Sequence, residues 1–361
     1  MNIRELAARA GLSKTTISAA LRDAPRISES TRRRVHDLAR DVGYWPDPAV
    51  AGMMSAIARK NVVNFSSPIL LLSDWPHVHE WERPDHALSR FYQGVLSRTR
   101  ELGYKIEELW MRAPGMNPRR VEQIIAARKT EGLIIFSYPK APAALDIDLS
   151  QYSCVVIGRA LVSPTFYSAD HDHHQGMFLS LEQIKKQGYQ RPGLCLTEDA
   201  NERTMHCWAA AYQFYLSQRP AKDRVPMMLI KDHCDTGAYQ KWIRTYKPDV
   251  VIVSHGGMME FLGKAGFEIP RDFGVSVLFQ SHGCSNVAGI DICDEAIAGR
   301  AVDVLVEQMR NNRRGPPAHP ETILMHGIWR DGPSLPMIDL RPGPEISTPH
   351  HSAIPRRTAI A

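Results

Sequence analysis

The sequence predicts an N-terminal all-α domain followed by a larger α/β domain, with doubly wound parallel sheets in two lobes. Three short amphipathic helical patterns occupy the first 45 residues. From about residue 67 to 330, apolar strand-like runs alternate with helical patterns, which is typical of parallel sheets covered by helices on both faces. A chain of 361 residues is also too long for one small core.

Positive charge is concentrated at the N-terminus. Residues 1–60 contain 11 Lys and Arg against 6 Asp and Glu. The whole chain contains 44 basic and 39 acidic residues, so the remainder is balanced, with 33 of each. This distribution indicates a polyanionic partner for the N-terminal segment alone.

Composition argues against a membrane, secreted or zinc-binding protein. The longest apolar runs, PILLL (68–72) and GLIIF (132–136), are far shorter than the ~20 residues that span a bilayer. The N-terminus has no apolar signal segment, and the six cysteines are scattered without a C-x-x-C pair. We therefore expect reduced thiols, no metal site and a cytoplasmic protein.

Small polar residues and a glycine mark the boundaries of the three N-terminal helices. Asn2 can cap the first helix, with Glu5 placed to complete a capping box, and Gly11 can end it. Ser13 and Ser28 can cap the second and third helices. The apolar inner faces are expected at Ile3, Leu6, Ala7, Ala10, Ile17, Ala20, Leu21, Val35, Leu38, Ala39 and Val42. This order of helices and tight turn is that of a helix-turn-helix.

The second helix lies in the stretch GLSKTTISAALRD, residues 11–23, which is rich in small hydroxylated side chains. Such side chains let a helix lie close in the major groove of DNA and hydrogen-bond to phosphates and base edges. A small helical protein-interaction bundle is the alternative. For the arginines at 32–34, we favour contact with DNA phosphates over the alternative that they only form a solvated face of the helix.

A short segment, YWPDPAVAGMMSAIARK (44–60), links the two parts. Pro46 stops the preceding segment, Asp47 can cap, and Pro48 suits the first position of a helix. The predicted helix is too short to be stable alone in water.

The α/β part is read as a series of alternating elements. Strands are expected at 68–73, 104–110, 133–137, 154–157, 193–197, 226–230, 249–254 and 275–280. Helices are expected near 88–102, 118–129, 173–187, 203–217, 236–246, 257–265 and 293–311. The predicted divisions are a helix-turn-helix DNA-binding domain (1–46), a hinge helix and linker (47–60), a two-lobed α/β domain (61–335) and a Pro-rich disordered tail (336–361).

The first 54 residues resemble the lactose/galactose-repressor (LacI/GalR) family of bacterial transcription regulators. The resemblance runs through AGLSKTTIS, ISESTRRRV and GYWPDPAVA. The later pattern is similar to the two-lobed periplasmic-binding-protein-like domain of such regulators, with echoes in KKQGYQRPGL (185–194) and AIAGRAVDVLVEQM (296–309). The resemblance implies a homodimer that binds a pseudo-palindromic operator in double-stranded DNA, under the control of a small molecule bound between the lobes.

The sequence departs from the family pattern at several positions. The family usually has arginine where this chain has Ala19, and often asparagine at the position of Arg22. The arginine near the start of the 203–217 helix aligns with Trp208. The family's paired aspartates after the strand VSVL are replaced by Gln280, Ser281 and His282.

The DNA-contacting residues are expected on the outer face of the second helix and in the hinge. We assign Lys14, Thr15 and Arg22 to base edges, and Thr16 and Ser18 to phosphates. Met53 falls where the family has a leucine that wedges between base pairs in the minor groove, and its thioether side chain is suited to that role.

The effector site is expected at the carboxyl ends of the strands, where open α/β sheets bind ligands. The first lobe is expected to contribute Asp74, Trp75 and Arg159, and the second Asp199, Arg203, Trp208, His255 and Gln280. Such a set favours stacking and neutral hydrogen bonds, and a carbohydrate is the first candidate for the effector.

An α/β enzyme with an appended DNA-binding head is the alternative function. The run SADHDHHQG (168–176) could form a metal or phosphoesterase cluster, but Asp170 or Asp172 serves equally well as a helix cap. The sequence contains no P-loop, G-x-S-x-G, H-E-x-x-H or G-x-G-x-x-G motif, which favours a regulator without catalytic residues, cofactor or metal.

Overall fold

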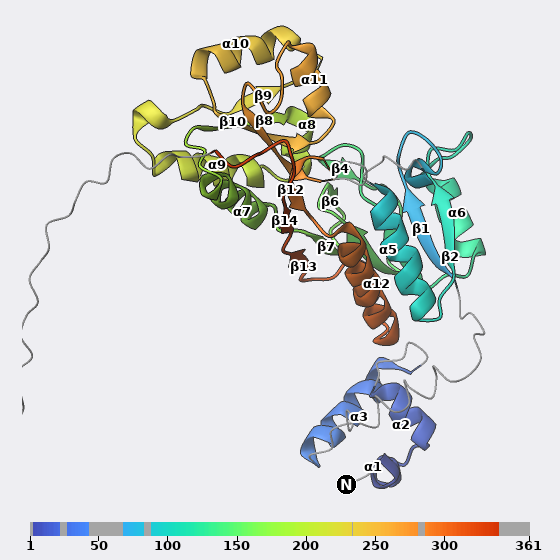
Figure 1. Cartoon of the computed structure of the whole chain (residues 1–361). Coiled ribbons are helices and arrows are strands. Elements are labelled where there is room, and N and C mark those ends of the chain that lie inside the picture. Colours follow the sequence, from blue (N-terminus) through green and yellow to red (C-terminus); the bar gives the residue numbers. More distant parts are fainter. Residues whose placement is uncertain are drawn as a thin grey trace, which may run out of the picture.

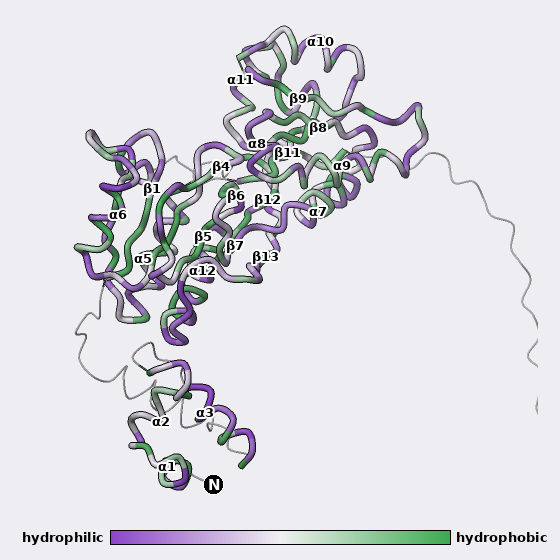
Figure 2. The backbone as a smooth tube through the Cα atoms, turned by 180° about the vertical axis from the view of Figure 1, so that it is seen from behind, coloured by the Kyte–Doolittle hydropathy of each residue, from purple (hydrophilic) through white to green (hydrophobic). Residues whose placement is uncertain are grey.

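The computed structural model describes residues 3–21, 27–42, 68–82, 88–232, 234–280 and 286–338. These residues form an N-terminal helical unit and two α/β lobes (Figure 1). Figure 2 shows that hydrophobic residues are concentrated in the strands of the lobes.

The N-terminal unit contains α1 (Ile3–Ala10), α2 (Lys14–Ala20) and α3 (Glu29–Asp41). Two of the predicted caps are confirmed, because Ser13 Oγ accepts a hydrogen bond from Thr16 N at 3.0 Å and Ser28 Oγ accepts one from Thr31 N at 3.3 Å, whereas Asn2 lies outside the described residues. Gly11 adopts a φ of +63°, the left-handed conformation that glycine takes without strain. The core of this unit consists of Leu6, Ala7, Ala10, Ile17, Ala20, Val35 and Ala39.

The first lobe is built on a six-stranded parallel sheet in the order β13-β7-β5-β3-β1-β2. Its strands are β1 (Ile69–Ser73), β2 (Ile106–Trp110), β3 (Gly132–Ile135), β5 (Ser153–Ile157), β7 (Tyr167–His171) and β13 (Thr322–Met325). One face packs against α5 (Leu88–Glu101) and α12 (Asp294–Arg310), and the other against α6 (Pro118–Ala127). All five residues of β1 are buried, as expected for a strand covered on both faces. The 3-10 helix η1 (Glu80–Glu82) and the short strands β4 (Ala143–Ala144) and β6 (Leu161–Ser163) complete the lobe.

The second lobe is built on a sheet in the order β14-β12-β11-β10-β8-β9, with only β14 antiparallel to its neighbour. Its strands are β8 (Pro192–Thr197), β9 (Met228–Ile230), β10 (Val250–His255), β11 (Gly274–Phe279), β12 (Ala288–Asp291) and β14 (Ile328–Arg330). One core lies under α7 (His173–Lys186), α8 (Glu198–Arg203) and α9 (Cys207–Ser217), and another under α10 (Thr236–Tyr246) and α11 (Met258–Lys264). The 3-10 helix η2 (Ala221–Asp223) follows α9.

Three chain segments connect the lobes. The first runs from β7 into α7, the second from β12 into α12, and the third from β13 into β14. They meet around His171, whose Nδ1 lies 3.1 Å from the Met325 carbonyl oxygen. A Cβ on Gly327 would lie 2.8 Å from the His171 ring and 2.5 Å from Ile290, so the three segments are in contact where they cross. This crossing is the natural hinge between the lobes.

The expected elements correspond closely to those observed, with two exceptions. The helix expected over 203–217 is two helices, α8 and α9, separated by a turn in which Met205 and His206 have positive φ. The expected strands did not include β4, β6, β7, β12, β13 and β14, because these segments are short and most of them mix polar and apolar residues. The double-lobed fold class itself is confirmed.

Candidate functional sites

The helix-turn-helix surface presents basic and hydroxylated side chains at the N-terminus of α2. Lys14 is exposed, and Thr16 Oγ1 lies 2.8 Å from Ser13 Oγ. The side chains of Thr15 and Ser18, together with Arg22 and Met53, lie outside the described residues. Ala19, at the position where the family usually has arginine, is buried.

The arginines of α3 have intramolecular partners. Arg32 and Arg33 form ion pairs with Glu29 at 3.1 and 3.0 Å. Arg34 donates a hydrogen bond to the carbonyl oxygen of Ala10, at the end of α1. Arg34 therefore supports the packing of α1 against α3, whereas the exposed pairs of Glu29 contribute little and are open to exchange.

The carboxyl edge of the first sheet carries an aromatic and charged group. Arg112 holds Asp74 in a two-pronged ion pair, with distances of 2.8 and 3.1 Å. Trp110 Nε1 donates to the Trp75 carbonyl oxygen at 2.8 Å, and Trp75 Nε1 donates to the Ser137 carbonyl oxygen. The ends of β1, β2 and β3 are thereby fixed to one another.

At the junction of the lobes, the structure brings Arg159 close to Trp208. Arg159 Nε lies 2.9 Å from Asp170 Oδ2, and its Nη2 lies 3.7 Å from Cys207 Sγ in α9. His173 Nε2 lies 3.4 Å from the same Asp170 oxygen, and the His173 ring packs edge-on against Trp208 at 4.9 Å. This group joins the end of the first sheet to α7 and α9 of the second lobe.

Charge partners keep Asp170 ionised in this junction. Burial alone would raise the pKa of Asp170, but His173 and Arg159 together lower it to about 2. Burial dominates at His171, where desolvation and the neighbouring His173 lower the pKa to about 4. Near neutral pH, the junction therefore holds an ion pair beside a neutral imidazole.

Several buried polar atoms at this junction form no hydrogen bond with the described residues. They are Trp208 Nε1, His173 Nδ1 and Arg203 Nε. Arg203 Nε has only a distant ion pair, 3.9 Å from Asp199 Oδ2. Because burying an unsatisfied donor costs about 1–3 kcal/mol, these atoms are suited to a polar molecule that would satisfy them.

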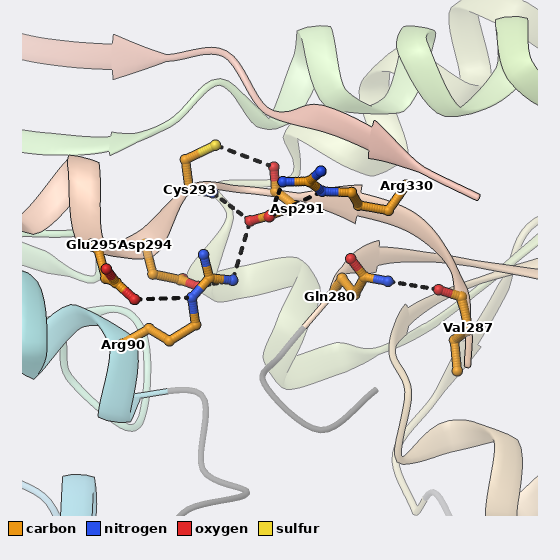
Figure 3. Close-up of polar contacts among 8 residues, drawn as sticks. All are labelled: Arg90, Gln280, Val287, Asp291, Cys293, Asp294, Glu295 and Arg330. Carbon is orange, nitrogen blue, oxygen red and sulfur yellow. Dashed lines mark hydrogen bonds and ion pairs between the residues drawn. The ribbon is translucent and has the colours of Figure 1, made fainter. Parts of the chain in front are cut away.

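Two further expected effector residues of the second lobe lie at the carboxyl ends of the paired strands β10 and β11. His255 is exposed at the end of β10, and Gln280 follows β11, where its Nε2 donates to the Val287 carbonyl oxygen at 2.7 Å (Figure 3). The structure thus brings Arg159, Arg203 and Trp208 toward one centre, with Asp74 and Trp75 on the edge of the first sheet.

Sequence reasoning missed a second charged cluster, which lies at the hinge. Arg90 of α5 reaches Asp291, Asp294 and Glu295 at the crossing from β12 to α12, and Arg330 of β14 also contacts Asp291 (Figure 3). No local motif marks these residues, because Arg90 and Asp291 are 201 positions apart. The run SADHDHHQG did contain Asp170 and His173, and Asp172 is the predicted cap of α7, accepting from Gln175 N at 2.9 Å.

The described residues contain no group of three or more His, Cys, Asp or Glu side chains arranged to hold a metal ion. None of the helices in the described part of the chain is both long and apolar enough to cross a membrane.

Comparison with solved structures shows the fold of the lobes. The chain is similar to a transcriptional regulator CelR–cellobiose complex, with 16% identity, a TM-score of 0.56 and coverage of 92% of this chain and 99% of that one. It is also similar to a lac repressor dimer bound to operator and an anti-inducer, with 16% identity, a TM-score of 0.53 and coverage of 93% and 99%.

Sequence comparison finds more distant likenesses. A curated relative, the HTH-type transcriptional regulator MalR of Streptococcus pneumoniae, is 21% identical over 196 residues, or 53% of this chain. The match covers 55% of that relative's length. Residues 2–47 match the family model described as bacterial regulatory proteins, lacI family. The family match thus covers the helix-turn-helix unit at the N-terminus, and the likeness to the solved structures extends over the two lobes.

Proposed function

We propose that this protein is a sequence-specific DNA-binding transcriptional regulator that acts as a repressor. It binds a pseudo-palindromic operator as a homodimer and is controlled by a small-molecule effector. The observation that carries this proposal is the capped helix-turn-helix of residues 3–42, which lies within the lacI family match and precedes two α/β lobes. A protein with this role works in the cytoplasm, on the DNA of the nucleoid.

The positive charge of residues 1–60 supports double-stranded DNA as the partner. We assign Lys14, Thr15 and Arg22 to base edges, and Thr16 and Ser18 to phosphates. The exposure of Lys14 at the start of α2 is consistent with this assignment. Phosphate contacts supply affinity that depends on salt, whereas base contacts supply sequence preference.

The operator is first selected from random DNA with the full-length protein, and binding is then measured with variants. Arg22→Ala is expected to weaken binding by about 1–3 kcal/mol and to relax the preference at one base pair. Arg40→Ala is the control, because Arg40 is exposed at the far end of α3 and pairs with Asp37. If Arg22→Ala weakened all sequences equally and only reduced the salt dependence, Arg22 would be a phosphate contact.

Met53 is proposed to wedge between base pairs in the minor groove. Removing its side chain should reduce the bend of the bound operator, since the inserted apolar group maintains the kink. Bending is measured by the gel mobility of circularly permuted operator fragments, with Met54→Ala as the control. An unchanged bend in Met53→Ala would exclude this role.

The effector is proposed to bind between the lobes, in contact with residues of the two groups described above. The proposed contacts are Asp74, Trp75, Arg159, Asp199, Arg203, Trp208, His255 and Gln280. A carbohydrate fits an indole face together with buried donors, because sugars present both an apolar ring face and hydroxyl groups. The CelR likeness supports this choice, since that regulator was solved with cellobiose.

The effector is sought by a thermal-shift screen over sugars, sugar acids and nucleobases, followed by calorimetry. Trp208→Phe is the informative variant, because Trp208 is only 4% exposed and an alanine would leave a large cavity. The phenylalanine keeps an aromatic ring and removes the Nε1 donor, so the effector should bind more weakly to it. Tyr246→Phe, far from the junction on α10, is the control. Equal affinity in Trp208→Phe would show that this contact is wrongly assigned.

The alternative function, an enzyme with a DNA-binding head, is addressed by a panel of hydrolase substrates. We propose that the protein is not an enzyme, so no turnover is expected with the full-length chain. Turnover abolished by Asp170→Asn would instead support a catalytic role for the junction.

A further inference from the structure

The hinge contains an aspartate, Asp294, whose surroundings favour the protonated form of its carboxyl group. Asp294, the first residue of α12, is fully buried, and neither of its oxygens hydrogen-bonds to another described residue. It lies on the segment that crosses from β12 of the second lobe into α12 of the first. A buried carboxylate without hydrogen bonds is costly to keep ionised.

The charges around Asp294 do not balance when all of them are ionised. Arg90 of α5 lies 3.4 Å from Asp294, 3.2 Å from Asp291 and 3.7 Å from Glu295. Arg330 of β14 lies 3.3 Å from the other oxygen of Asp291. Among the described residues, two guanidinium groups therefore face three carboxylates, and one bound proton makes this cluster neutral.

The same guanidinium is shared between the lobes. Arg90 and Asp294 both belong to helices of the first lobe, whereas Asp291 ends β12 of the second (Figure 3). An ionised Asp294 competes with Asp291 for Arg90, whereas a protonated Asp294 leaves Arg90 to Asp291. Protonation thus strengthens the contact between the lobes at the expense of a contact within one lobe.

We propose that Asp294 is a proton-binding residue of the hinge, and that its protonation favours the arrangement of the lobes seen here by leaving Arg90 to Asp291. If the lobes transmit the effector signal, as in the proposed function, operator binding becomes sensitive to pH through this residue. Both the geometry and the charge balance place the bound proton on Asp294, because Asp291 and Glu295 have other stabilisation. Asp291 accepts a hydrogen bond from Cys293 N at 3.0 Å, and the Glu295 side chain is 60% exposed.

The acidity of these groups agrees with this assignment. Burial raises the pKa of Asp294 to about 7, although Arg90 favours the ionised form. Burial also acts on Asp291, but the Cys293 amide, Arg90 and Arg330 lower its pKa. Among the described residues, the Cys293 thiol is the other titratable group at the cluster, and its pKa is raised because it is partly buried.

The direction of the pH dependence follows from the raised pKa of Asp294. A state that raises the pKa of an acid is favoured at low pH and loses that advantage as the pH rises toward the raised value. The arrangement seen here should therefore be favoured below pH 7 and lose population up to about that pH. The ratio of the two arrangements should change by at most about tenfold per pH unit, because one proton is involved.

The test measures the distance between the lobes by double electron–electron resonance. Nitroxides are attached to p-acetylphenylalanine at positions 119 in α6 and 241 in α10, both exposed, and samples are frozen between pH 5.5 and 8.5. The distance distribution of the otherwise wild-type protein should shift with pH. Asp294→Asn, a neutral analogue of the protonated acid, should retain the low-pH distribution throughout. Glu295→Gln, the matched control on the neighbouring carboxylate, should retain the pH-dependent shift.

A pH-independent distance in the wild type, or an unchanged pH response in Asp294→Asn, would overturn the proposal. Titration of the aspartate side chains by ¹³C NMR should show one resonance with a midpoint near pH 7 that is lost in Asp294→Asn. Its absence would also overturn the proposal, and Asp294→Ser serves if the asparagine variant does not fold. Neither measurement uses DNA or an effector, so their outcome is independent of whether the protein is a repressor.

Discussion

Gly94 in α5 should be intolerant of even one methyl group, because α5 packs directly on the start of α12. A Cβ at this position would lie 2.3 Å from the Glu295 carbonyl oxygen, 2.7 Å from Glu295 Cα and 2.9 Å from Ala298 Cβ. The first two are backbone atoms, which cannot turn away as a flexible side chain can. The helices would have to separate by about 1 Å to restore ordinary contact distances.

The expected magnitude follows from two opposing effects. Overpacking of this kind costs about 1–3 kcal/mol. Replacing a helical glycine by alanine raises the free energy of unfolding by about 0.5–1 kcal/mol, because alanine restricts the unfolded chain and favours the helix. Gly94→Ala should therefore lower the free energy of unfolding, although by less than the clash alone would.

Gly299 provides a matched control at the same helix pair. It lies inside α12, and a Cβ there would be 3.8 Å from Arg98 Cβ, an ordinary contact. Gly299→Ala should therefore raise stability by about 0.5–1 kcal/mol. Since the helix term is common to both variants, their difference isolates the clash at about 1–3 kcal/mol.

The assay is thermal and urea unfolding of the full-length variants, followed by circular dichroism. For a domain of this size, 1 kcal/mol corresponds to roughly 2–4 °C in Tm. Gly94→Ala should unfold below, and Gly299→Ala above, the wild-type temperature. Equal stability of the two variants would refute the close approach of α5 and α12.

Three further predictions concern the caps and the junction. Ser28→Ala should cost about 1 kcal/mol, because the Thr31 amide loses its acceptor; hydrogen exchange of the α3 amides should accelerate in this variant but not in His36→Ala. Asp170→Asn should destabilise the first lobe by about 3–5 kcal/mol, because it leaves the largely buried Arg159 without its partner, and denaturant unfolding that matches the wild type would contradict the ion pair. His171→Leu should make folding less sensitive to acid. Because the pKa of His171 is lowered to about 4, the stability that the neutral imidazole provides is fully present above about pH 6.5 and is lost as the pH falls toward 4. A plot of Tm against pH should therefore be flatter in the variant than in the wild type.

Local sequence signals determined the positions of most elements. The caps Ser13, Ser28 and Asp172 and the turn glycine Gly11 could be predicted because each acts within three or four residues of its position. Buried strands such as β1 could be predicted because a strand covered on both faces must be apolar along its length. The N-terminal unit was read from the sequence because its helices are short, amphipathic and consecutive.

The tertiary structure decided what the sequence could not. The strands β7 and β12 escaped prediction because they end in polar residues, Asp170, His171 and Asp291, which are buried only where the three crossing segments meet. Trp208 and Arg159 were predicted separately as ligand contacts, yet their link through Asp170 and His173 depends on the packing of α7 and α9 against the end of the first sheet.

The hinge cluster shows the same limit. Arg90 and Asp291 are 201 residues apart, and no spacing rule relates them. Their contact exists because parallel strands must be joined by crossover connections, which bring distant segments of the chain to one edge of a sheet. The sequence by itself therefore determined most of the elements and the likeness of its N-terminal residues to the lacI family, whereas the folded chain decided which ionisable groups share a guanidinium at the hinge.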